Sequence, residues 1–247
     1  MPLTFSAIFL GNSSTMIDPI EGNNTAENAG LFVGQTYGSA GNALSNNIVS
    51  FTSQDVGGRA DALDMNNFLA NDLAVIDDGS GPQTYVFDGT SVFNATITYV
   101  DGSTATNLPM VLVQMTNGDL YVVPWPNNTN GTNAALQAAP IRSISFDSLI
   151  GDTYAGMGID RPALTFPTCF ASGTRIETGR GPVAVERLGP GDLVLTADHG
   201  LQPVRWAGAQ RFDARELATR VALRPVRIAA GALGGGLPLR DLVASPQ

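Results

Sequence analysis

The sequence contains no lysine and only one cysteine and one histidine among its 247 residues. A single cysteine, Cys169, excludes an internal disulfide and any metal site built from several cysteines. No apolar run approaches the roughly 18 residues of a membrane-spanning helix, so no membrane span is expected. Cys169 therefore cannot stabilise the fold through an internal disulfide. It either takes part in chemistry or has no special role.

Charge divides the chain at Cys169. Residues 1–168 hold three arginines against fifteen Asp and Glu, a net charge of −12, whereas residues 169–247 hold ten arginines against seven acids, a net charge of +3. All asparagines also precede Cys169. Two parts that differ this much in composition indicate two domains. The acidic part offers no basic face to phosphate, so no nucleic-acid partner is expected.

Residues 1–150 are expected to form an acidic β-domain rich in Asn, Gly and Thr. Runs of β-branched and aromatic residues over 91–100 and 110–116 predict strands. Asn117-Gly118, which lies between two such runs, predicts a tight hairpin turn with φ > 0 at both residues. The expected fold is an antiparallel β-sandwich or β-roll.

The same part offers two helical patterns and no catalytic motif. Residues 59–73 carry apolar side chains at helical spacing and predict a short helix. Asn133 is the expected cap of a second one. Asp77-Asp78-Gly79 indicates a turn and lacks the spacing of a calcium loop, so neither a metal site nor a cofactor is expected. An extracellular ligand of this domain is left open, because the sequence does not reveal what the domain binds.

Residues 151–168 are expected to be a linker, because Gly, Asp and Pro are frequent there. Pro167 fixes its own φ and disfavours a helix at Phe166. The chain is therefore expected to run extended into Cys169.

Four short motifs follow Cys169 in order: G-T-R-I-E-T at 173–178, G-D-L-V-L at 191–195, P-V-R-W at 203–206 and R-P-V-R-I-A-A-G-A-L at 224–233. Together with the cysteine, they resemble the start of the Hint family, the hedgehog/intein self-processing domains, in its bacterial branch. The resemblance covers residues 169–247. It implies the first part of an all-β, horseshoe-like Hint domain.

The resemblance implies an N–S acyl shift, in which the Cys169 thiol converts the Thr168–Cys169 peptide bond into a thioester. Water, an amine or a thiol then resolves the thioester, so the activity is a single-turnover autocatalytic cleavage without a cofactor. The family also uses a T-x-x-H motif, and Ser245 fits its threonine position. The histidine is expected directly after Gln247. Residues 1–247 are therefore expected to be an inactive piece of a longer protein.

Two alternatives remain open. The first is a secreted adhesive or carbohydrate-binding β-module that carries a degenerate Hint domain. The second is a cysteine hydrolase that uses Cys169 and His199, although the polar turn around His199 favours an exposed turn residue. An acidic, lysine-free chain rich in Asn, Gly and Thr suits a secreted bacterial protein, and export is the expected localisation.

Overall fold

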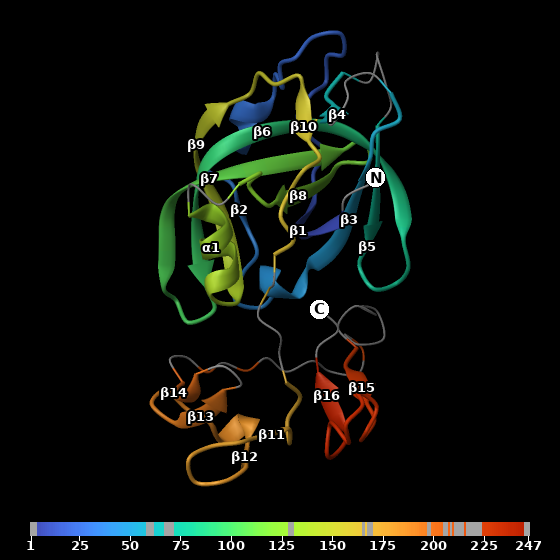
Figure 1. Cartoon of the computed structure of the whole chain (residues 1–247). Coiled ribbons are helices and arrows are strands. Elements are labelled where there is room, and N and C mark those ends of the chain that lie inside the picture. Colours follow the sequence, from blue (N-terminus) through green and yellow to red (C-terminus); the bar gives the residue numbers. More distant parts are fainter. Residues whose placement is uncertain are drawn as a thin grey trace. The chain divides into compact units, whose positions relative to one another are not determined.

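The computed structural model describes residues 4–57, 62–66, 72–127, 131–164, 166, 170–196, 199–204, 207, 209, 215 and 224–244. The chain separates into two compact units, Met1–Pro167 and Thr168–Gln247, which are called unit 1 and unit 2 (Figure 1). Both are built mainly from antiparallel strands, which confirms the predicted mainly β class.

Antiparallel strands of unit 1 pair with one another in a closed cycle. The strands are β1 (Thr4–Asn12), β2 (Thr36–Tyr37), β3 (Ile48–Gln54), β4 (Ala62–Asp64), β5 (Leu73–Asp77), β6 (Gln83–Tyr99), β7 (Thr104–Met115), β8 (Asp119–Val123), β9 (Ile141–Gly151) and β10 (Gly156–Gly158). Six of them pair in the cyclic order β5, β6, β7, β8, β1, β3 and back to β5. β9 pairs with β6 on the edge opposite β7, and β2 pairs with β9. The helical segments are η1 (Ala29–Phe32), η2 (Leu44–Asn46) and α1 (Thr132–Ala138).

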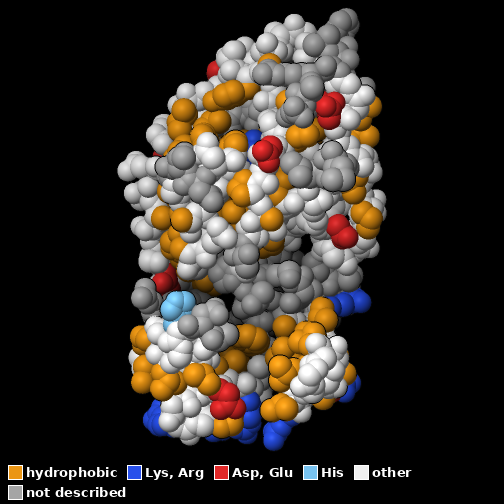
Figure 2. Space-filling model, viewed as in Figure 1, with side chains coloured by type: hydrophobic (Ala, Val, Ile, Leu, Met, Phe, Trp, Pro, Cys, Tyr) orange, Lys and Arg blue, Asp and Glu red, His pale blue; other side chains and the backbone are white. Residues whose placement is uncertain are grey.

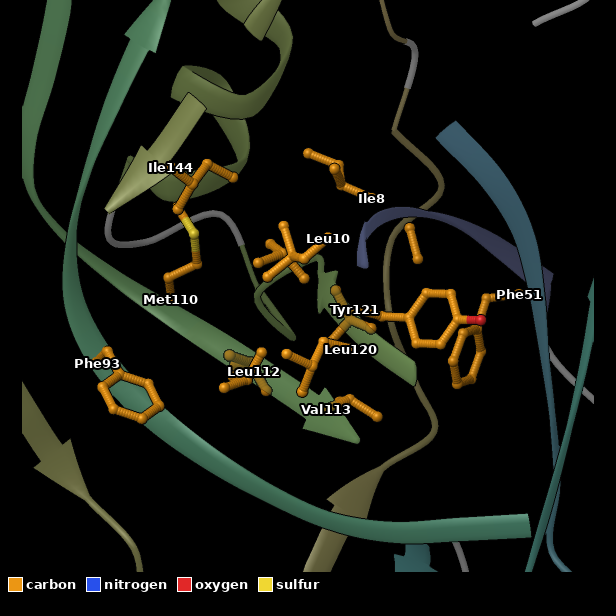
Figure 3. Packing of buried hydrophobic residues seen from close by; sticks show 14 of the residues in the cluster. Ile8, Leu10, Phe51, Phe93, Met110, Leu112, Val113, Leu120, Tyr121 and Ile144 are labelled. Atoms are coloured by element: carbon orange, nitrogen blue, oxygen red, sulfur yellow. The ribbon is translucent and has the colours of Figure 1, made fainter. Parts of the chain in front are cut away.

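Apolar side chains from these strands fill the interior of unit 1 (Figure 3). Phe5 stacks on Phe51 with ring centroids 5.0 Å apart, and Phe93 meets Phe146 at 4.8 Å. Such aromatic pairs add to the free energy gained by burying their apolar area. The pattern of β-branched and aromatic residues in the sequence therefore marks strands that supply a buried core.

The hairpin between β7 and β8 is confirmed, but its turn differs from the prediction. Gly118 has φ of +90°, as predicted, but Asn117 does not have a positive φ. In the described part of the chain, Asn107 is the only non-glycine residue with positive φ. The Gly118 N–H donates to the Met115 carbonyl at 2.8 Å, which makes a type I turn followed by a left-handed glycine. A Cβ at position 118 would collide with the Ser13 carbonyl, so only glycine fits there.

The prediction of a helix over 59–73 is wrong for the residues of this range that the structure describes. Ala62–Asp64 form β4, which pairs with β10; residues 58–61 and 67–71 lie outside the described residues. The second predicted helix is present as α1, but Gly131 occupies its N-cap position. The Asn133 side chain instead bonds the backbone N–H and carbonyl of Trp125, at 2.8 and 2.9 Å.

The segment expected to be a linker largely belongs to unit 1. β9 extends to Gly151 and β10 covers Gly156–Gly158. Beyond β10, Leu164 and Phe166 are buried against the core of unit 1. These single apolar residues pack without regular secondary structure, which is why composition alone suggested a linker.

Unit 2 consists of short hairpins. The described elements are β11 (Arg175–Ile176), β12 (Val183–Ala184), η3 (Val185–Arg187), β13 (Leu193–Thr196), β14 (Gly200–Pro203), β15 (Val226–Ile228) and β16 (Leu242–Ala244). None of its described residues is buried, and Leu195 and Leu201 face each other across β13 and β14 while remaining exposed. Figure 2 shows apolar side chains on the surface of this unit.

Candidate functional site

The predicted site residues Thr168, Cys169 and Ser245 lie outside the described residues. Their nearest described neighbours are Phe170, which follows the cysteine, and Ala244, which precedes the serine. These neighbours define the local framework of the candidate site.

Phe170 and Ala244 form an antiparallel bridge. Next to it, the Ala171 N–H donates to the Val243 carbonyl at 3.0 Å. One covalent step, about 3.8 Å between Cα atoms, separates Phe170 from Cys169 and Ala244 from Ser245. The fold thus joins the chain neighbours of two candidates that lie 76 positions apart in the sequence.

The strand that ends at Ala244 is held by its partner β15. Val226 pairs with Ala244, and the Arg227 guanidinium binds the Asp241 carboxylate with Nε 2.8 Å from Oδ2. The other oxygen of Asp241 accepts the Ala230 N–H at 3.0 Å. These contacts fix the hairpin against which Phe170 pairs.

A tight turn follows the cysteine and is held from two sides. The Thr174 N–H donates to the Ala171 carbonyl at 3.1 Å, and Gly173 adopts φ of +88° within this turn. The Val185 N–H donates to the Thr174 carbonyl at 2.8 Å, which joins the turn to η3. The turn therefore connects the β15–β16 hairpin with the β11–β12 hairpin.

Glu186 holds the same turn through its side chain. Its Oε2 accepts the Gly173 N–H at 2.9 Å. This bond is the largest cause of the lowered pKa of Glu186, because it favours the charged carboxylate. No pattern in the sequence singled out Glu186, since its partner is a backbone group thirteen residues away.

We expect Glu186→Ala to slow any chemistry at Cys169 by roughly two- to fivefold, because an exposed hydrogen bond contributes modestly to local order. Glu186→Gln keeps an oxygen acceptor and is expected to retain near wild-type rates. Glu177→Ala, a change of another exposed acid in unit 2, serves as the control. Equal rates for all three variants, measured by mass spectrometry of any product formed at Cys169, would show that the Gly173 contact does not matter.

His199 lies in the turn between β13 and β14 and is exposed. Its backbone N–H donates to Thr196 Oγ1 at 3.2 Å, and its carbonyl accepts from the Gln202 amide at 2.9 Å. Figure 1 draws this hairpin and the β15–β16 hairpin on opposite sides of unit 2. The proximity of His199 to Cys169 stays a prediction, because the cysteine is not among the described residues.

Asp192 supports the neighbouring turn. Its Oδ2 accepts the Gly189 N–H at 2.9 Å, and its Oδ1 lies 3.0 Å from Nη2 of Arg180. The G-D-L-V-L motif thus places its aspartate as a turn-forming residue. Thr178 bridges Val194, so this turn and β13 are joined to the β11–β12 hairpin.

A second cluster of titratable groups lies in unit 1. Asp18 and Asp88 are only 2% and 3% exposed, and three of their four carboxyl oxygens have no hydrogen-bond partner. Burial raises the pKa of Asp18 to about 7, and the nearby carboxyls of Glu21, Glu27 and Asp88 raise it further. Burial also raises the pKa of Asp88 to about 7, although the Asp18 N–H partly offsets this. Both groups therefore titrate near neutral pH.

No group of three or more His, Cys, Asp or Glu among the described residues is arranged to hold a metal ion. Within that same part of the chain, no helix is long and apolar enough to cross a membrane.

Comparison with protein families gives a match to the model of the Hint domain over residues 168–247. Unit 2 belongs to the Hint domain family. The match begins at the residue where unit 2 begins and covers about a third of the chain. Neither the curated proteins nor the solved structures gave a match to this chain. The motif order after Cys169 therefore predicted the family correctly.

Proposed function

We propose that the Hint domain cleaves its own chain through an N–S acyl shift at the Thr168–Cys169 bond. The Cys169 sulfur attacks the Thr168 carbonyl carbon, the C–N bond breaks, and the nitrogen takes a proton to become the amine of Cys169. The product is a thioester between Thr168 and the Cys169 sulfur. Water, an amine or a thiol then attacks the same carbon and releases the acyl fragment 1–168, while Cys169 regains its thiol.

The observation that carries this proposal is the Phe170–Ala244 bridge within a unit that belongs to the Hint family. A nucleophile and a hydroxyl that act on one peptide bond must come from segments held close together. The bridge and the Ala171–Val243 hydrogen bond hold the two segments that lead to Cys169 and Ser245. Ser245 is proposed to contact the scissile amide through its hydroxyl.

Three physical requirements follow for the site. The thiol must lose its proton, and at an ordinary cysteine pKa of about 8.5 only a few per cent is thiolate at pH 7. The amide must lose resonance, and a twist of about 12° in ω stores about 1 kcal/mol toward that. The oxyanion must be stabilised, since losing one donor costs about 10² to 10³ in rate.

The proposed acyl fragment is unit 1 with its tail. An acidic, lysine-free fragment of this composition suits export, and we include secretion in the proposal. An adhesive or carbohydrate-binding module with a degenerate Hint domain is the competing function, and it predicts no covalent chemistry at Cys169.

Trapping the thioester with hydroxylamine tests the proposal directly. The chain, extended by a histidine directly after Gln247, is incubated with hydroxylamine, whose nitrogen attacks the thioester carbon and displaces the Cys169 thiolate. We expect mass spectrometry to find fragment 1–168 as a hydroxamic acid, together with a fragment that begins at Cys169. Cys169→Ala is expected to give neither. Wild-type chain that stays intact under these conditions would favour the competing binding module.

A further inference from the structure

A long irregular segment of unit 1, residues 13–28, follows β1 and is called the strap here. All of its residues are described, and none belongs to a strand or a helix. Backbone hydrogen bonds hold both of its ends. The Ser13 N–H donates to the Gly118 carbonyl at 2.9 Å, and the Ala26 N–H donates to the Asp152 carbonyl at 2.8 Å. The position of the strap between these ends therefore depends on side-chain contacts.

Two paired residues, Gly89 on β6 and Gln114 on β7, hold the middle of the strap. Gln114 is fully buried, and its Oε1 accepts the Ile17 N–H at 2.6 Å while its amide donates to the Thr15 carbonyl at 3.0 Å. A Cβ at position 89 would lie 2.9 Å from the Ile17 side chain and 3.0 Å from Cβ of Asp18. The strap thus packs directly on the backbone of β6.

This contact buries two carboxyl groups, one on each side of it. Asp18 belongs to the strap, and Asp88 lies next to Gly89, where the register of β6 against β7 shifts. One Asp88 oxygen accepts the Asp18 N–H, but its other oxygen and both oxygens of Asp18 have no partner. Glu21 and Glu27 of the strap add further negative charge nearby. Within the described residues, no positively charged group offsets the pair.

The pair ties the position of the strap to protonation. An ionised carboxylate without partners is costly inside a protein. Burial accordingly raises the pKa of both groups from 3.8 to about 7 while the strap is closed, and water would return them toward 3.8 once it lifts. The stability of the closed position is therefore fully present below about pH 4 and is lost as pH rises to about 7.

We infer that the strap is a pH-sensitive element of unit 1, which the protonated Asp18–Asp88 pair keeps closed and which opens locally when the pair ionises. The bonds at Ser13 and Ala26 limit the opening to the middle of the strap, so the paired strands remain folded. Opening exposes Ile17 and the part of β6 that it covers. The inference goes beyond the proposed function and does not depend on it, because every contact lies within unit 1.

Hydrogen exchange of residues 1–247, followed by mass spectrometry, tests this opening. Each amide rate is divided by that of an unfolded peptide at the same pH, which gives a protection factor free of the intrinsic effect of base. We expect protection over residues 15–22 to fall by about 30-fold from pH 5.5 to pH 8.5, the change for one group whose pKa moves from 3.8 to about 7.

The dependence on urea separates local opening from global unfolding. Local opening exposes little surface, so low urea should leave exchange of the strap unchanged while it speeds exchange in β3. At pH 8.5 we also expect the strap amides to exchange at least about tenfold faster than those of β3. These comparisons use the wild-type chain and do not depend on the folding of any variant.

Variants then assign the effect to the pair. The double variant Asp18→Asn/Asp88→Asn carries neither charge, and its protection over residues 15–22 should stay constant within about threefold over the same pH range. Each single variant should lose an intermediate amount. Asp101→Asn, the same change in an exposed turn, serves as the matched control and should behave as the wild type.

Four results would overturn the inference. Protection of the strap that does not fall with rising pH would show that the pair does not control it. Equal exchange rates and equal urea dependence in the strap and β3 would show that the strap opens only on global unfolding. A double variant with the pH dependence of the wild type would assign the effect to other groups. Restored protection of the wild type at pH 8.5 on adding calcium chloride would show that the pair holds a cation in place of protons.

Discussion

Asp18→Asn and Asp88→Asn are expected to raise the free energy of unfolding at pH 8 by about 2 to 4 kcal/mol each, and to change it little at pH 4. Both carboxyls are almost fully buried, and three of their four oxygens have no hydrogen-bond partner. An asparagine of similar shape keeps an oxygen acceptor for the Asp18 N–H and carries no charge. The substitution therefore removes the penalty of ionising a buried group.

The direction in which the free energy of unfolding changes with pH follows from the direction of the pKa shifts of Asp18 and Asp88. Burial and like-charged neighbours raise the folded-state pKa of both groups from 3.8 to about 7. Between these values the native state holds protons that the unfolded state has lost, so the stability contributed by these groups falls as pH rises. The loss begins near pH 4 and levels off above about pH 7. Because the two carboxyls interact, the titration belongs to the pair.

Urea unfolding followed by circular dichroism from pH 4 to pH 8 measures this effect on the full chain. The control is Asp78→Asn, because the Ser80 hydroxyl bonds Asp78 and lowers its pKa, which gives the opposite sign. We expect the wild type to lose stability over this range more steeply than either Asn variant. A loss of stability in the Asn variants at pH 8 would instead show that the buried carboxylates are charged and needed.

The sequence predicted the strands of unit 1 better than the connections between them. β-branched and aromatic runs marked β6 and β7 correctly, because such residues pack on a half-buried sheet surface. Residues 62–65 are buried at every position, so their apolar spacing could not distinguish a strand from a helix. The β7–β8 hairpin was predictable, but its turn type depends on Gly118 lying against Ser13, a contact distant in sequence.

The candidate site was predictable only through the order of its motifs. The Phe170–Ala244 bridge joins residues 74 positions apart, and no local pattern reveals such a pairing. In unit 1, Asp88 had a signal of its own, because it interrupts an apolar strand run. The interruption marks the residue as unusual, but it does not identify Asp18 as its neighbour.

The largest effect is expected from a histidine placed directly after Gln247, where it completes the T-x-x-H pattern that begins at Ser245. Residues 1–247 alone are expected to stay intact, whereas a form to which this histidine is added should cleave between Thr168 and Cys169. The reason is the protonation of the departing nitrogen. Without an imidazole near the scissile nitrogen, the amine leaves slowly and the equilibrium returns to the amide. Losing a general acid typically lowers the rate by about 10² to 10⁴.

Mass spectrometry of both forms, with and without added thiol, measures this difference. The extended form should give a fragment that ends at Thr168, and added thiol should release it faster because thiol exchanges with the thioester. Replacing the added histidine with alanine should return the extended form to the behaviour of residues 1–247, and Cys169→Ala should abolish release in both. Equal cleavage of the two forms would show that the general acid lies within residues 1–247, which would favour His199. An extended form that never cleaves, with or without thiol, would leave unit 2 as a Hint fold without its chemistry and would favour the binding-module function.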